Sequence, residues 1–492
     1  MKYIHRVVKK TRFYIGKLSL SEKDLVKGTL WNILGNGFGK VSILITTIFV
    51  AKILGPELFG KWGVIRSTSA LFSILLGFGV GVTAIKYVAE YKDNHKEKVG
   101  GIIGLTFTLA LLLGVFCSFI LFVSSEFISL TILQEADLIH PIELSSLLLI
   151  FIALNGVLSG CLAGMNSFSS IAFSNFFGGI LGALGIIYLS SELGLIGLIY
   201  GYILYYLLIS MALLFFFQRK LRENKITVSL VDYKQHLSII LHHNVPAILS
   251  GGIGGAVVWG VFAYVSRLNM GFSIIGINNA AKIAQNALME VAAQIDLPII
   301  SYLSSSKGGA RNNKINLFTP LLIGLIFILP IMYIPEFVGF IFKNSSFDNK
   351  DFPLVVSLTM LTTYIMVYKR GMGRSLITLN LMWWGVYENL FWGGLIVTFT
   401  YLFVQDLGSI GLALAFTLAY LIDLLVIKPI YYKKGLISKV LISSKEAFFI
   451  WTTVLIAPIL ILTNISLNMR LLMLLLVIII QCFCLIGVYK RI

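Results

Sequence analysis

The sequence is poor in charged residues and in cysteine, and both shortages exclude classes of protein. Only 12% of its 492 residues are charged, whereas 58% are hydrophobic and the mean hydropathy is +0.91. A soluble globular surface cannot be built from that mixture. The few cysteines fall in apolar runs and show neither a disulfide framework nor zinc-ligand spacing. They are Cys117, Cys161, Cys482 and Cys484.

Motifs that would indicate an enzyme are also missing. The stretch Gly35–Lys40 superficially suggests a phosphate-binding loop, but Leu34 stands where the first glycine belongs and Val41 follows the lysine. The sequence has no Asp-x-Asp pair for a metal-dependent glycosyltransferase, and its longest predicted outer loop, 125–143, is too short for a polymerase active site. We therefore expect no catalytic residues and no metal site.

Long apolar runs follow one another along almost the whole chain. A transmembrane helix needs about 20 mostly apolar residues to cross a hydrocarbon core of ~30 Å. The sequence provides about fourteen such runs, which predicts an all-α polytopic membrane protein. The predicted spans are 28–54, 62–85, 99–124, 144–165, 170–190, 195–217, 244–266, 273–300, 315–335, 353–368, 375–403, 408–430, 447–463 and 471–489.

Lysine and arginine are concentrated in alternate loops, as expected of a membrane protein whose short cytoplasmic loops are basic. The tails and loops assigned to the inside, among them 218–243 and a short basic loop at 369–374, hold most of the 39 Lys and Arg residues. The outer loop 125–143 carries only acidic charges. We therefore expect both termini to be cytoplasmic in a bacterial or archaeal plasma membrane. The net charge of +17 then faces anionic lipid, so no nucleic-acid partner is expected.

The chain contains an internal repeat of six spans. Gly60 recurs as Gly276 and Arg66 as Lys282, both at an offset of 216, and the stretch 192–198 matches 406–412. Because six is even, both halves enter the membrane in the same direction and enclose a cleft around a pseudo-twofold axis along the membrane normal. The predicted domains are a basic amphipathic N-terminal segment (1–27), an N-lobe (28–217), a cytoplasmic linker (218–243), a C-lobe (244–430) and two added spans with a short tail (431–492).

Three segments resemble one family of transporters. Ala51–Gly60 is similar to the pattern that ends the first span of oligosaccharide flippases, and Met382–Trp392 and Gly408–Ala413 are similar to their spans 11 and 12. Over roughly residues 20–430 the chain therefore resembles Wzx-type flippases of the multidrug, oligosaccharidyl-lipid and polysaccharide (MOP) exporter superfamily. That resemblance implies a V-shaped, two-lobed fold like those of MATE and MurJ transporters, with two extra C-terminal helices.

Polar residues within the spans gather on single helix faces. A charge in lipid costs about 2.5–3.5 kcal/mol on insertion scales, so each ionisable residue there marks a candidate site. Alternatively, such stripes hold helices together, or their basic side chains reach the membrane interface. At ~100° per residue, the aligned residues are Asn32, Asn36 and Lys40 on span 1, Arg66 on span 2, and Asn279, Lys282, Asn286 and Glu290 on span 8.

The basic members of these stripes predict a cationic cavity between the lobes. Lys40, Arg66 and Lys282 lie on spans 1, 2 and 8, and Arg66 and Lys282 are repeat partners on opposite sides of the proposed cleft. Guanidinium and ammonium groups bind phosphate oxygens. Together with Arg267, these residues would suit the pyrophosphate of a polyprenyl-linked oligosaccharide, with the asparagines of the stripes as further substrate contacts.

The carboxylates in the spans are candidates for coupling. Glu290 either forms an ion pair with a neighbouring helix or exchanges a proton as the cavity changes its exposure. Glu388 and Asp296 are weaker candidates, and Asp423 is expected to pair with Lys428. No cofactor is expected, and an H⁺ or Na⁺ gradient or the membrane potential would drive transport.

The sequence therefore favours a flippase for a polyprenyl-pyrophosphate-linked oligosaccharide, such as an O-antigen or capsule repeat unit, that works by alternating access. The alternatives are a flippase for a peptidoglycan lipid precursor, a MATE-type drug or cation antiporter and, least favoured, a membrane glycosyltransferase or polymerase. We expect a monomer that contacts membrane lipids and other polysaccharide assembly proteins. The sugars of the cargo cannot be read from the sequence.

Overall fold

The computed structural model describes residues 20–76, 80–91, 96–229, 252–304, 314–343, 345–379, 381 and 383–491. These residues are helical apart from short turns, and no strand occurs among them. The helices are α2 (Leu20–Leu76), α3 (Val80–Tyr91), α4 (Lys96–Glu126), η1 (Phe127–Leu133), η2 (Ala136–Leu138), α5 (Ile139–Gly164), α6 (Phe168–Asn224), Gly252–Ser266, α8 (Gly271–Ser304), α9 (Lys314–Ile323), η3 (Gly324–Ile328), α10 (Leu329–Tyr333), α11 (Glu336–Ile341), α12 (Phe352–Thr378), α13 (Trp383–Lys433), α14 (Val440–Ser443), α15 (Lys445–Leu462) and α16 (Leu467–Arg491).

Three of the long helices are divided by a glycine in the left-handed region, where residues with a Cβ are strained. These glycines are Gly55 in α2, Gly194 in α6 and Gly408 in α13. Gly194 (φ 57°, ψ −131°) and Gly408 (φ 52°, ψ −123°) have nearly the same backbone conformation. Because they occupy matching places in the repeat, this similarity supports the six-span duplication that the sequence predicts.

The fourteen predicted spans correspond to helices over most of their described residues, although α12 ends at Thr378 and α13 begins at Trp383, inside the span predicted at 375–403. Nine described segments are long and apolar enough to cross a membrane. The glycine turns divide α2, α6 and α13 into two spans each, and the shorter Gly252–Ser266 and the more polar α8 supply the remaining two. The predicted N-terminal segment 1–27 lies largely outside the described residues, as does most of the linker 218–243.

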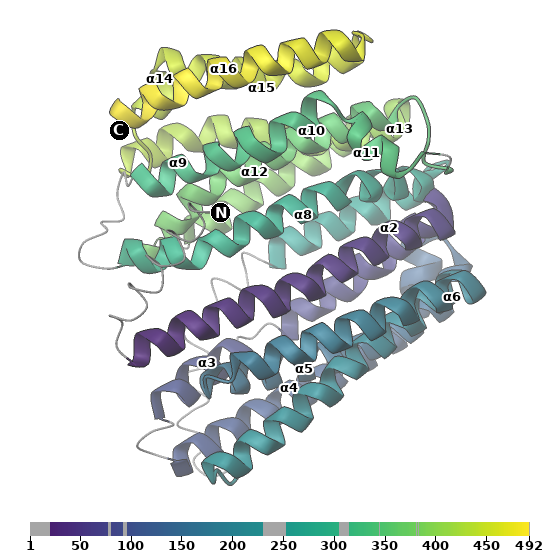
Figure 1. The fold of residues 1–492 in the computed structure, drawn as a ribbon. Coiled ribbons are helices and arrows are strands. Elements are labelled where there is room, and N and C mark those ends of the chain that lie inside the picture. The colour runs from purple at the N-terminus through teal and green to yellow at the C-terminus, as the bar shows by residue number, and fades with distance from the viewer. Residues whose placement is uncertain are drawn as a thin grey trace, which may run out of the picture.

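The helices form two groups that lie side by side (Figure 1). We call α2 to α6 the N-lobe, and the helices from Gly252–Ser266 to α13 the C-lobe. Helices α15 and α16 lie along the outer edge of the C-lobe, against α10 and α12. There the Tyr333 hydroxyl donates a hydrogen bond of 2.6 Å to the Thr453 carbonyl, and Arg470 forms an ion pair with Glu336.

The two lobes meet where α2 and α8 cross, next to Gly55. A Cβ on Gly60 would lie 1.8 Å from the Phe272 carbonyl oxygen, and one on Gly276 would lie 1.8 Å from the Pro56 carbonyl oxygen. Phe272 is the repeat equivalent of Pro56, so the contact is reciprocal, as at the interface of a twofold-symmetric dimer. We call this the glycine contact. From it, α2 and α8 separate toward their opposite ends (Figure 1).

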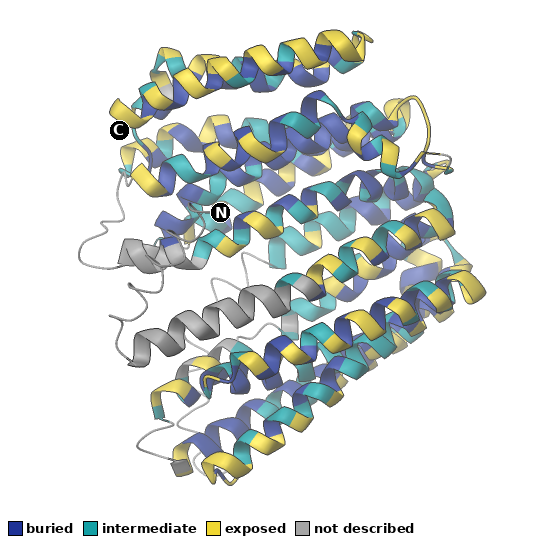
Figure 2. Cartoon of the chain, in the orientation of Figure 1, coloured by how far each residue is buried: buried dark blue, intermediate teal, exposed yellow. Residues whose placement is uncertain are grey.

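Exposed residues, coloured yellow in Figure 2, occur along the helices of the bundle, and many of them are large and apolar. Phe119 on α4, Phe215 on α6 and Phe483 on α16 each expose more than half of their surface. Soluble monomers rarely present large continuous apolar surfaces, whereas lipid accommodates them. The pattern agrees with a chain that crosses the membrane many times.

Candidate functional site

Arg66 and Lys282 occupy equivalent places in the two lobes. Each lies about three helical turns from the glycine-turn end of the bundle, Arg66 after Gly55 and Lys282 after the start of α8. The Lys282 ammonium lies 4.0 Å from the ring centroid of Phe416 on α13. Arg66 interacts electrostatically with Tyr206 on α6. Both cations thus lie on the second span of their repeat, and the Lys282 ammonium lies over an aromatic ring of the sixth.

Neither cation is neutralised by a carboxylate. Within the described part of the chain, no Asp or Glu oxygen lies within 4.0 Å of the charged nitrogens of Arg66 or Lys282. Arg66 is exposed and Lys282 is partly exposed. An uncompensated charge within a membrane span is costly, so both residues are suited to an anionic ligand.

Lys282 lies in a pocket of about 170 Å³ inside the C-lobe. The lining comes from Gly252–Ser266, α8, α12 and α13, and no described residue of the N-lobe contributes to it. The Lys282 ammonium also lies 5.3 Å from the ring centroid of Phe262. The sequence-based prediction set Lys282 opposite Arg66 across the cleft between the lobes, but the structure turns its ammonium into the C-lobe. The lining residues include Asn278, Lys282, Thr362, Trp392, Phe416 and Tyr420.

Lys40 and Glu290 join the two lobes. They form an ion pair between α2 and α8, and about half of each side chain is exposed. The sequence leaves two roles open for Glu290, an ion pair with a neighbouring helix and proton exchange. The structure shows Glu290 in the ion pair. Exposed pairs are worth about 1 kcal/mol or less in water, so the pair can break when the lobes move. A second contact between the lobes is a hydrogen bond of 3.0 Å, which Trp259 Nε1 of the C-lobe donates to Thr68 Oγ1 of the N-lobe.

The other predicted substrate contacts are dispersed. Asn279 packs against Gly63 of α2, where a Cβ would lie 2.1 Å from Asn279 Nδ2, and Asn286 is exposed further along α8. Asn32 and Asn36 belong to α2, but their side chains lie outside the described residues. Arg267 donates a hydrogen bond of 2.5 Å to the Ile132 carbonyl. Arg267 therefore lies in the turn before α8, at the glycine-turn end of the bundle. It precedes Lys282 by about four helical turns.

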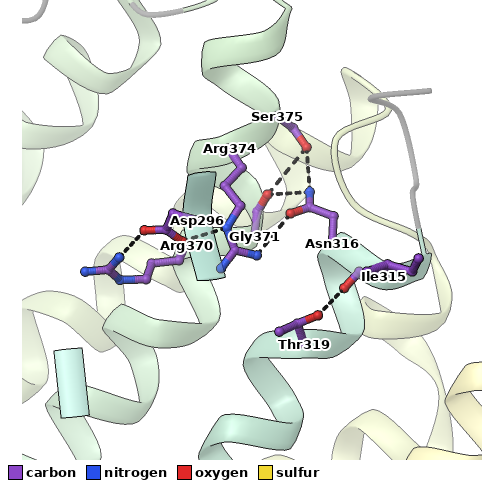
Figure 3. A network of polar contacts seen from close by, with 8 residues as sticks. All are labelled: Asp296, Ile315, Asn316, Thr319, Arg370, Gly371, Arg374 and Ser375. Atoms are coloured by element: carbon purple, nitrogen blue, oxygen red, sulfur yellow. Dashed lines mark hydrogen bonds and ion pairs between the residues drawn. The ribbon is translucent and has the colours of Figure 1, made fainter. Parts of the chain in front are cut away.

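The predicted basic loop 369–374 is wrong, because α12 continues through it to Thr378. Its basic side chains belong to polar networks inside the C-lobe, one of which is drawn in Figure 3. There Asp296 on α8 forms ion pairs with Arg370 and Arg374, the latter at 2.8 Å. Asn316 on α9 accepts a hydrogen bond from Arg374 and donates one of 2.7 Å to the Gly371 carbonyl. Asp296, a predicted coupling residue, is thus held between two guanidinium groups.

The predicted pair between Asp423 and Lys428 is also wrong. Asp423 forms an ion pair with Lys369 of α12, which also contacts Glu388. Lys428 directs its ammonium at the rings of Tyr368 and Trp451, 5.1 Å and 4.5 Å from their centroids. Sequence spacing favoured the nearby residue on the same helix, whereas the true partner lies on another helix. Lys369 could have been predicted as the partner of Asp423 only if 369–374 had been assigned to a helix.

Cations without a carboxylate partner are suited to an anionic ligand. Within the residues that the structure describes, no group of three His, Cys, Asp or Glu side chains could hold a metal ion. Of the predicted basic residues, Lys40 is paired with Glu290, the Lys282 ammonium lies over Phe416, and Arg267 donates to the Ile132 carbonyl.

Comparisons with known proteins agree with the fold. A family model described as polysaccharide biosynthesis protein matches residues 25–275, just over half of the chain. A putative O-antigen transporter of Shigella flexneri is 24% identical over 154 residues, which are 30% of this chain and 36% of that protein. The chain is thus matched over only about a third of that relative's length.

Solved structures of two kinds have the same fold. The lipid II flippase MurJ, in an inward closed conformation, matches with a TM-score of 0.67 at 16% identity, covering 93% of this chain and 98% of that one. An inward-facing multidrug resistance transporter of the MATE family, from the MOP superfamily, matches with a TM-score of 0.61 at 16% identity, covering 80% and 95%. The MATE- and MurJ-like fold inferred from the sequence is confirmed.

Proposed function

The chain belongs to the polysaccharide biosynthesis protein family, and we propose that it is a flippase for a polyprenyl-pyrophosphate-linked oligosaccharide. It carries this lipid from the inner to the outer leaflet of the plasma membrane by alternating access. The pyrophosphate binds the cations of the two lobes, the polyprenyl tail stays in lipid, and the sugars pass between the lobes. The protein itself breaks no bond of the cargo.

The observation that carries this proposal is the pair of unneutralised cations, Arg66 and Lys282. They lie at repeat-equivalent positions on α2 and α8, Arg66 with an exposed side chain and Lys282 with its ammonium in the C-lobe pocket, so each lobe carries one such cation. Arg66 provides a guanidinium fork for phosphate oxygens, and Lys282 provides a point charge. Lys40, half-exposed on α2, adds a third cation once its pair with Glu290 opens.

The contacts between α2 and α8 suggest how access alternates. The glycine contact closes the bundle at the end that the distribution of basic residues assigns to the outside. This conformation would therefore face the cytoplasm and receive the cargo from the inner leaflet. Rocking the lobes would open the glycine contact and close the opposite end of the bundle. The pair between Lys40 and Glu290 lies on the side of the glycine contact that faces this opposite end.

A drug or cation antiporter is less well supported. An exporter of cationic drugs needs a carboxylate that is free to bind its cargo. Along the described inner stretches of the spans, Glu290, Asp296, Glu388 and Asp423 each form an ion pair with a lysine or arginine. The described spans therefore offer cations without a carboxylate partner, Arg66 and Lys282, rather than the free carboxylate that cationic cargo requires.

The proposal is tested by reconstituting the purified chain in liposomes with a fluorescent polyprenyl-pyrophosphate oligosaccharide in both leaflets. Movement is measured as the fraction that a membrane-impermeant reagent can modify from outside. Arg66→Gln and Lys282→Gln should each reduce the rate at least about tenfold, the effect of losing ~1.4 kcal/mol of binding. Lys350→Gln, which removes an exposed lysine outside the spans, should leave it unchanged.

Two results would count against the proposal. Wild-type rates in both charge-removing variants would mean that the cations do not hold the cargo. Movement of a peptidoglycan lipid precursor in preference to the oligosaccharide would assign the chain to the alternative cargo, which shares the pyrophosphate but differs in its sugars.

A further inference from the structure

The C-lobe contains a buried charge cluster that substrate binding does not explain. Lys369 of α12 forms ion pairs with Glu388, from the first half of α13, and with Asp423, from its second half. We call these three residues the lysine triad. Tyr431 donates a hydrogen bond to Glu388 Oε2. The triad joins α12 to both halves of α13, well inside the lobe.

The charges of the triad do not balance. With both carboxyls ionised, one ammonium faces two carboxylates, and the cluster carries a net charge of −1. Asp423 is fully buried, and Lys369 and Glu388 each expose only 14% of their side chains. A net charge in such surroundings costs several kcal/mol, and the usual remedy is to bind a proton or a cation.

One atom of the triad has room for that proton. Asp423 Oδ2 contacts Lys369, but Asp423 Oδ1 is buried and has no hydrogen-bond partner among the described residues. Both oxygens of Glu388 are engaged, one by Lys369 and the other by Tyr431. A proton on Asp423 Oδ1 makes the triad neutral and leaves every other contact in place.

The charged groups on the surrounding helices do not supply the missing positive charge by direct contact. Lys428 points at the rings of Tyr368 and Trp451, and Lys282 lies against Phe416. Arg370 and Arg374 pair with Asp296 of α8. They follow Lys369 on α12 by ~100° and ~140° of rotation, so they face α8 rather than α13.

The remaining titratable neighbours are phenols. Tyr420, on α13, has the Lys369 ammonium 5.4 Å from its ring centroid and also lines the pocket that holds Lys282. Tyr431 is engaged as a donor to Glu388. A phenol is neutral near neutral pH, so neither side chain changes the charge balance of the triad.

From this geometry we infer that the lysine triad is a proton-binding site, with the proton on Asp423 Oδ1. Because the carboxyls share one lysine, the proton belongs to the coupled group rather than to an isolated side chain. Lys369 and Glu388 each keep 14% of their side chains exposed, so the triad is not completely enclosed by the lobe. The assignment of the site stands on its own, whereas its use in coupling transport to a proton gradient rests on the proposed function.

The site is tested by infrared difference spectroscopy of the full chain in nanodiscs, which detects the carbonyl band of a protonated carboxyl. The wild type should show this band at neutral pH in sodium-free buffer. Asp423→Asn and Glu388→Gln should both lose it, because each leaves one carboxylate for one ammonium. Lys369→Met should gain intensity, since both carboxyls then bind protons. Glu290→Gln, which alters an exposed ion pair, is the matched control and should match the wild type.

Three results would overturn the inference. The band could be absent from the wild type at neutral pH, or it could survive in both Asp423→Asn and Glu388→Gln, which would place the proton elsewhere. It could also vanish when sodium chloride replaces choline chloride, which would make the ligand a sodium ion. If Asp423→Asn does not fold, Glu388→Gln and Lys369→Met still decide, because their predicted changes have opposite signs.

The role in transport is measured separately, with a pH-sensitive dye inside the liposomes used for the flippase assay. Oligosaccharide movement with no proton movement would reject coupling but keep the site. Absence of the carboxyl band from the wild type, with normal oligosaccharide movement, would reject the site but keep the flippase. No movement of oligosaccharide by the wild type would reject the proposed function without touching the infrared result.

Discussion

The N-lobe and the C-lobe share a plan but differ in where they keep their charges. Ion pairs within the described N-lobe lie at its ends, such as the pair between Lys61 and Glu135 at the glycine-turn end and that between Arg219 and Glu223 at the other. The C-lobe instead holds two networks inside the bundle, around Asp296 and around Lys369. Both lobes thus keep the same plan of helices and one cation at the repeat-equivalent position, Arg66 or Lys282. Among the described residues, only the C-lobe has ion networks inside the bundle. We infer that cargo binding is shared by the lobes and that proton binding belongs to one of them.

The largest effect should come from breaking a network that the N-lobe lacks. Asp296→Asn leaves Arg370 and Arg374 without the carboxylate that they share, and losing one partner of a buried ion pair costs about 3 kcal/mol. We expect the purified variant to unfold at a clearly lower temperature in a thermal denaturation experiment. Glu223→Gln, which removes the carboxylate of an exposed pair in the N-lobe, should shift the midpoint little. Equal shifts would show that the two lobes do not differ in this way.

A smaller effect should come from the place where the lobes are alike. Gly60→Val and Gly276→Val each force a side chain against a carbonyl oxygen of the other lobe, and overpacking of this kind costs about 2 kcal/mol. Because the contact is reciprocal, the two variants should slow oligosaccharide movement to a similar extent. Gly37→Val is the control, since a Cβ there meets no atom within 4 Å. If only one of the two valines were harmful, the contact would not be symmetric in function.

The smallest effect should come from the pair that links the lobes. Lys40 and Glu290 are half-exposed, so their interaction contributes about 0.5 kcal/mol. Lys40→Glu and Glu290→Lys should each lower stability slightly, and the double variant with exchanged charges should recover the loss in a double-mutant cycle. A coupling energy of zero would mean that the two side chains act independently. Transport by the double variant would further show whether position 40 must be basic.

The sequence was sufficient for the spans, the repeat and the family, because these depend on patterns that extend over many residues. Apolar runs locate the helices, and matching glycines such as Gly194 and Gly408 reveal the duplication. Arg66 and Lys282 were found as repeat partners for the same reason. The ammonium of Lys282, however, points into its own lobe, since its direction depends on the packing of Phe262 and Phe416, which no spacing specifies.

The charge networks of the C-lobe could not be predicted, because a membrane span is recognised by its lack of charge. Lys369, Arg370 and Arg374 therefore looked like a cytoplasmic loop, although α12 carries them inside the lobe. Their carboxylate partners lie on α8 and α13, far away in sequence. Only the folded bundle shows that each of these basic side chains has a carboxylate partner on another helix.

The glycine contact also bears on how such a protein could have arisen. Pro56 and Gly60 of α2 meet Phe272 and Gly276 of α8, and each side of the contact is the repeat equivalent of the other. A surface that fits its own copy is what a symmetric homodimer requires. A six-span ancestor with this surface would already have paired with a second copy in the same orientation. Joining two such genes end to end would then preserve the interface and allow each half to evolve separately.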